Sequence, residues 1–135
     1  MALHKHIIIA VDFDGTIVED DYPKIGKEQI FAFSTMKELQ KAGHRLILWT
    51  VRHGKKLEEA VEFCKANGID FYAINKNYPE EIQDGSTSPK IYADMFIDDR
   101  NIGGFIGWGQ VHQLFFGEAN TPQKKNKGFF SFLKK

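Results

Sequence analysis

The sequence contains little cysteine, no net charge and no long apolar run. Its one cysteine, Cys64, excludes an intramolecular disulfide and fits a reducing cytoplasm. Eighteen basic and 18 acidic residues cancel, so net charge gives no reason to expect nucleic-acid binding. No stretch approaches the ~18 apolar residues of a membrane span, and residues 1–11 do not resemble a signal peptide. We therefore expect a soluble cytoplasmic protein.

Short apolar runs alternate with amphipathic segments along the chain. Continuous apolar runs are typical of strands that are covered on both faces, and apolar residues three and four positions apart are typical of helices. The pattern predicts strands at 6–11, 45–51, 69–74 and 93–99, helices at 27–42 and 55–67, and loops at 75–89 and 101–109. We expect an α/β, Rossmann-like three-layer sandwich, with a central parallel sheet and helices on both faces.

The last 18 residues differ from the rest of the chain. Residues 118–135 hold five lysines, one glutamate and three phenylalanines. We expect one domain over residues 1–117, followed by a flexible basic tail over 118–135. Docking of the tail onto the domain, into a partner's groove or onto an anionic surface is the alternative.

Two pairs of aspartates end two of the predicted strands. Asp12 and Asp14 follow the first strand, and Asp98 and Asp99 end the last one. Because parallel strands present their carboxyl ends at one edge of a sheet, we expect these side chains to converge. Neighbouring carboxylates repel unless a cation lies between them, and magnesium prefers such hard oxygen ligands. The sequence therefore predicts a magnesium site.

Thr50 ends the second predicted strand, and Lys90 lies just before the last one. The ordered set is "DFDGT" at 12–16, an apolar segment ending in Thr50, then Lys90, then "FIDD" at 96–99. This set resembles the four motifs of the haloacid dehalogenase (HAD) superfamily of phosphohydrolases, over residues 7 to about 101. "LWTVR" and "FIDDRN" make the chain most similar to the small phosphatases and nucleotidases of that group.

The resemblance implies a phosphatase that forms an aspartyl-phosphate intermediate. Asp12 would be the nucleophile, and Asp14 would protonate the leaving group and then activate water. Thr50 and Lys90 would hold the oxygens of the phosphate, as catalytic and substrate-binding residues.

The resemblance also implies a magnesium shell, in which manganese or cobalt could replace magnesium in vitro. Its ligands would be Asp12 and the backbone carbonyl of Asp14, and the shell would be completed by Asp98 and Asp99. One of these last two would bind the metal directly.

Some assignments stay open at this point. Lys76 is a rival of Lys90 for the lysine of the site, and Thr50 could be an ordinary strand residue. Arg52 could bind substrate phosphate or pair with Asp99, and we favour the ion pair. Tyr22 and Tyr78 are further candidate substrate contacts.

No cap domain fits into the short connections at 18–28 and 51–89. An open site suits a large phosphorylated substrate, such as a phosphoprotein or a nucleic-acid end. It equally suits a small phosphate ester, if a partner in a homo-oligomer or the 75–89 loop covers the pocket. Substrate identity and oligomeric state stay open.

Two other classes of protein share parts of this pattern. A receiver-type signalling domain carries its acidic pair after the first strand, whereas here that pair comes late, so we disfavour it. A catalytically silent HAD-like binding module that acts through the basic aromatic tail is the main alternative to an enzyme.

Overall fold

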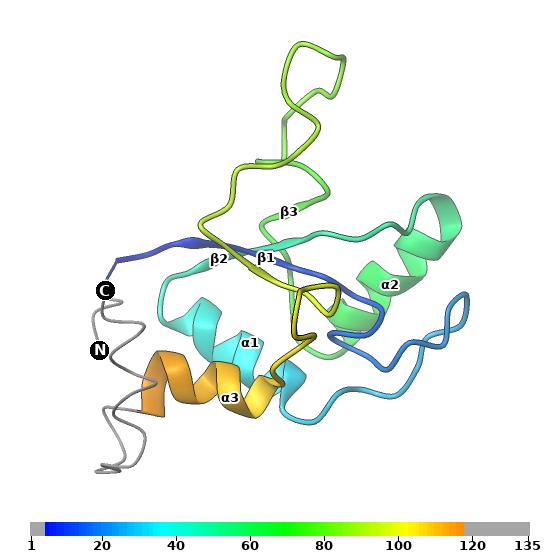
Figure 1. Ribbon diagram of the computed structural model, residues 1–135. Helices are drawn as coiled ribbons and strands as arrows, with labels where there is room; N and C mark the ends of the chain where they lie inside the picture. Colours follow the sequence, from blue (N-terminus) through cyan, green and yellow to red (C-terminus); the bar gives the residue numbers. More distant parts are fainter. Residues whose placement is uncertain (1–4, 118–135) are drawn as a thin grey trace.

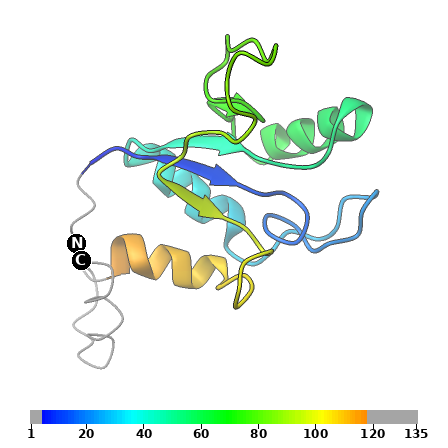
Figure 2. The same ribbon diagram turned by 45° about the horizontal axis from the view of Figure 1, so that its top comes forward.

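A computed structural model describes residues 5–117, and our expectations for the tail at 118–135 lie outside these residues. Four parallel strands form one sheet in the order β3-β2-β1-β4; Figure 1 labels the first three of these, and the strand order is clearest in Figure 2. The strands are β1 (Ile8–Val11), β2 (Arg45–Leu48), β3 (Ala73–Ile74) and β4 (Met95–Ile97). The helices are α1 (Ala32–Lys41), α2 (Gly54–Ala66) and α3 (Trp108–His112), which continues into the π-helical turn η1 (Gln113–Gly117). The α/β, Rossmann-like fold without a cap is thus confirmed for the described residues.

Side chains alternate between the two faces of the sheet, as the pleat requires. Ile9 and Val11 of β1 join the main core, to which α1, α2 and α3 all contribute buried residues, whereas Ala10 lies in a smaller cluster with Ile47 and Ile91. All three helices therefore lie on one face, and the segment 75–94 lies on the other side of the sheet (Figures 1 and 2).

This one-sided arrangement differs from the helices that we expected on both faces. The connection from β3 to β4 is the one that crosses the second face, and it runs through 75–94 without a helix. Pro79, Gly85 and Pro89 interrupt it at intervals too short for a stable helix. An irregular segment therefore takes the place of a second helical layer.

We predicted that the first helix would begin at Lys27, but it begins at Ala32. Glu28 forms an antiparallel bridge with Val18, which draws the preceding residues into a hairpin-like loop. Phe31 then adopts a left-handed conformation, with φ 68°, directly before the helix. Tertiary pairing therefore overrides the helical pattern of residues 27–31.

The end of the described chain forms a helix that we did not predict. Trp108 lies at the start of α3, inside the stretch that we expected to be a flexible loop. Its side chain is buried, and its indole Nε1 donates a hydrogen bond of 2.7 Å to the backbone oxygen of Thr16. This contact attaches α3 to the acidic loop that follows β1.

Among residues 5–117, none of the helices has the length and apolar character that crossing a bilayer requires.

Replacing Trp108 by phenylalanine should lower the free energy of unfolding by about 1–3 kcal/mol, because the buried oxygen of Thr16 loses its donor. Urea denaturation measures this change. Trp49→Phe is the matched control, since the indole of Trp49 makes no hydrogen bond to residues 5–117. Equal losses in the two variants would contradict a role for this hydrogen bond.

Candidate metal centre

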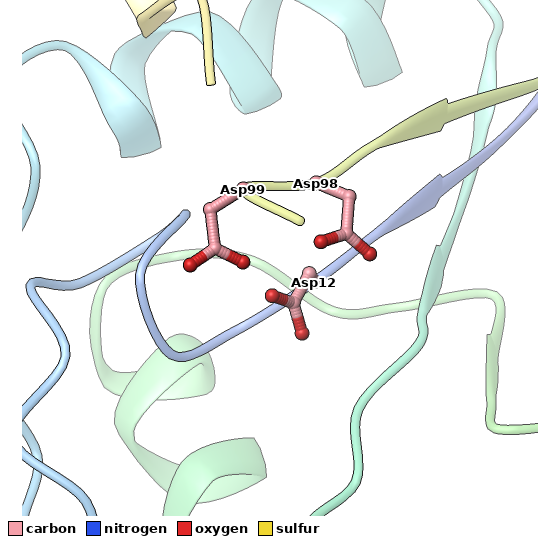
Figure 3. Close-up of side chains that lie close together, drawn as sticks. All are labelled: Asp12, Asp98 and Asp99. Carbon is pink, nitrogen blue, oxygen red and sulfur yellow. The ribbon is translucent and has the colours of Figure 1, made fainter. Parts of the chain in front are cut away.

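Three carboxylates meet at the carboxyl ends of two neighbouring strands. Asp12 follows β1, and Asp98 and Asp99 follow β4. Val11 is paired with Ile97 in the parallel register, so the two strands end side by side. One oxygen from each aspartate lies within 4.8 Å of the others, and the carboxylates gather around one space (Figure 3). The predicted convergence is therefore present for these three residues.

Burial and the two neighbouring carboxylates strongly perturb Asp12. The pKa of Asp12 is raised to about 8, first by burial, then by a hydrogen bond with Asp99 and by the negative charge of Asp98. One oxygen of Asp99, Oδ1, is buried and has no hydrogen-bond partner. A buried acceptor without a donor is costly, and a cation among the three oxygens would satisfy it. The donor set, made only of hard oxygens, fits a hard divalent cation.

The loop after β1 holds this group together. Gly15 has φ +84°, and a side-chain carbon at this position would overlap the Asp99 carboxylate. The Thr16 hydroxyl donates a hydrogen bond of 3.4 Å to Oδ2 of Asp12. The Gly-Thr pair of "DFDGT" thus permits the close approach of Asp99 and orients Asp12.

Asp14 does not join the group of three, because its carboxylate is bound by Arg52. Nε and Nη2 of Arg52 donate to the two oxygens of Asp14, each over 2.8 Å. Arg52 is 1% exposed, and its Nη2 also donates to the backbone oxygen of Lys24. The hydrogen bond with Asp14 raises the pKa of Arg52, so the arginine stays charged. Our expectation that Arg52 pairs with Asp99 was therefore wrong, because Asp14 in the loop after β1 binds it instead.

Thr50 lies two residues beyond β2, at the same edge of the sheet. Its backbone N–H donates to Oδ1 of Asn75 over 2.8 Å. Its Oγ1 accepts a hydrogen bond of 3.1 Å from the backbone N–H of Arg52, which leaves the hydroxyl proton available to another acceptor. Thr50 also lines the pocket that Asp12 and Asp98 line.

Neither candidate lysine lines that pocket. Lys90 is exposed, and its Nζ lies 5.7 Å from the centre of the Phe96 ring. Lys76 donates to the backbone oxygen of Pro79 over 3.3 Å. Both belong to the irregular segment 75–94, which runs along the face of the sheet that carries no helix. Sequence order alone does not reveal this path.

The acidic pocket has a volume of about 680 Å³. Of the two candidate substrate contacts, Tyr22 lines the pocket and Tyr78 does not. The pocket is lined by Asp12, Asp14, Asp20, Tyr22, Trp49, Thr50, Val51, Asp98 and Arg100. Sequence reasoning missed Asp20, Trp49 and Arg100. The signal for two of them was adjacency, since Trp49 precedes Thr50 and Arg100 follows the acidic pair.

Among solved structures, the chain is similar to one described as a conserved protein coded by a locus from Bacteroides thetaiotaomicron. It is 54% identical, with a TM-score of 0.79, and the match covers 87% of this chain and 94% of that one. The chain belongs to the family of this conserved Bacteroides protein. No protein-family model and no curated protein matches the present chain. The description of the Bacteroides protein names no activity, so functional inference for this family depends on the site.

Asp12→Asn should change how stability depends on pH in the metal-free protein. The pKa of Asp12 is raised from its ordinary value of 3.8 to about 8 in the folded chain. The protonated carboxyl therefore contributes fully to stability below about pH 4, and this contribution is lost as the pH rises through 8. The wild type should therefore lose stability between these values, and the variant, which cannot ionise, should lack this part of the decline. Urea unfolding in EDTA from pH 5 to 9 measures it.

The control for this experiment is Asp70→Asn, an exposed aspartate ahead of β3 at the opposite edge of the sheet. This variant should follow the wild-type pH dependence. Parallel pH profiles for the wild type and Asp12→Asn would contradict the raised pKa.

Gly15→Ala should destabilise the protein more than Gly85→Ala. Both glycines have positive φ, +84° and +91°, where a non-glycine residue costs on the order of 1–3 kcal/mol. Only at Gly15 does the new carbon also overlap Asp99, because Gly85 has open space around it. Thermal unfolding compares the variants, and equal losses would show that Asp99 moves aside freely.

Proposed function

We propose that this protein is a magnesium-dependent phosphatase of the HAD superfamily, which hydrolyses phosphate monoesters through an aspartyl-phosphate intermediate. The observation that carries the proposal is the group of Asp12, Asp98 and Asp99, in which one buried oxygen of Asp99 lacks a donor. The group lies at the carboxyl ends of parallel strands, where α/β proteins bind ligands.

Asp12 is the proposed nucleophile. Its carboxylate projects from the end of β1 into the pocket, and the Thr16 hydroxyl bonds to Oδ2. Attack on phosphorus requires the ionised form, so the proton that the raised pKa retains must leave first. Bound magnesium would neutralise the carboxylates and polarise the phosphate oxygens. Asp98 and Asp99 would hold it together with Asp12.

Asp14 is the proposed general acid and base, and its bond to Arg52 constrains that role. The carboxylate held by two hydrogen bonds from Arg52 cannot give a proton to a leaving group until it turns away from the arginine. In the observed arrangement, Arg52 instead fixes the position of Asp14 beside the pocket. Thr50 would donate its hydroxyl proton to a phosphate oxygen from the end of β2.

A non-enzymatic binding module is the second candidate. Two observations favour it. Among residues 5–117, no lysine lines the pocket, and the carboxylate of Asp14 is bound by Arg52. Such a module would bind a cation at the three aspartates without turnover.

Hydrolysis of para-nitrophenyl phosphate tests the proposal. The full chain should be active with magnesium, inactive with EDTA, and slowed on the order of 10³-fold or more by Asp12→Asn, because the nucleophile is lost. Asp70→Asn should keep wild-type activity, since it lies outside the pocket. An inactive wild type that still binds magnesium by calorimetry would favour the binding module.

A further inference from the structure

We propose that Arg100 is the cation that binds the phosphate of the substrate, in the role that the resemblance gives to a lysine. This inference rests on the proposed function, because it concerns the ligand of the same pocket. Arg100 lines the pocket together with Asp12 and Thr50, and its side chain is exposed.

Other basic side chains that we considered for this role are engaged or distant. Arg52 lies near the pocket, but its guanidinium is buried and binds both oxygens of Asp14. Lys90 and Lys76 do not line the pocket. Among the residues that line it in the described part of the chain, Arg100 is the one that carries a positive charge.

The charge balance of the pocket favours such a cation. Asp12, Asp14, Asp20 and Asp98 line it, and only Asp14 has an ion pair with an arginine or lysine of residues 5–117. A phosphate monoester would bring up to two more negative charges into this space. Magnesium alone would leave an excess of negative charge, and an arginine at the rim offsets it.

The backbone of Arg100 is fixed beside the metal group. Its N–H donates to Oδ1 of Asp98 over 2.8 Å, and Asn101 donates to the backbone oxygen of Asp98 over 2.6 Å. The guanidinium itself makes no hydrogen bond or ion pair within residues 5–117. A guanidinium can bind two phosphate oxygens at once through its planar fork of N–H groups.

The topology places Arg100 and Thr50 on the two sides of the nucleophile. Strand β1 lies between β2 and β4 in the sheet. Thr50 follows β2 and Arg100 follows β4, so a phosphate in front of Asp12 would meet the hydroxyl from one side and the guanidinium from the other.

Calorimetric titration of the full chain with inorganic phosphate, in saturating magnesium, tests the inference. Arg100→Ala should raise the dissociation constant about 10- to 100-fold, since a charge-assisted hydrogen bond is lost, and Arg100→Lys should recover part of it. Lys41→Ala is the control, because this exposed lysine at the end of α1 also removes one positive charge. With para-nitrophenyl phosphate, the KM of Arg100→Ala should rise more than its kcat falls.

Several results would overturn the inference. They are phosphate binding by Arg100→Ala within twofold of the wild type, a larger loss in Lys90→Ala, and a wild type that binds no phosphate. A weaker affinity of Arg100→Ala for magnesium alone would also overturn it, because it would mean that the substitution damages the turn at Asp98. A wild type that binds phosphate through Arg100 but hydrolyses no ester would contradict the proposed function and leave this inference standing.

Discussion

The buried ion pair between Arg52 and Asp14 determines which charges the pocket presents. It joins the end of the second strand to the loop after the first, and the guanidinium also lies 5.0 Å from the centre of the Phe13 ring and 5.1 Å from that of Tyr22. A buried arginine can satisfy only the partners within its reach. Because Arg52 binds Asp14, it forms no ion pair with Asp12, Asp98 or Asp99, and no other arginine or lysine of residues 5–117 pairs with them.

Much of the fold could be predicted from the sequence, because apolar periodicity reports burial directly. The predicted bounds of the strand at "HIIIAV" and of the helix that contains Cys64 lie within two residues of the observed bounds. The start of α1 was wrong, because the bridge between Val18 and Glu28 is a long-range pairing that no local pattern contains. The helix at Trp108 was missed because glycines in 101–109 obscure its start.

The candidate site could be predicted in its acidic part and not in its basic part. The aspartates follow strands, and strand order fixes where strand ends lie, so their convergence needs only the topology. Long basic side chains reach several ångströms from flexible connections, so their partners depend on the path of the backbone. The ammonium of Lys90 therefore lies over the Phe96 ring and does not line the pocket, and Arg52 binds Asp14 instead of Asp99.

The hydrogen bond from Trp108 to Thr16 joins residues that are 92 positions apart in the chain. Contacts of such high sequence separation form late in folding, because a long loop must close before they stabilise anything. During synthesis, the acidic loop emerges from the ribosome long before the indole that holds it and before the strand that carries Asp98. The site can therefore acquire its final shape only when nearly all of residues 5–117 have been translated.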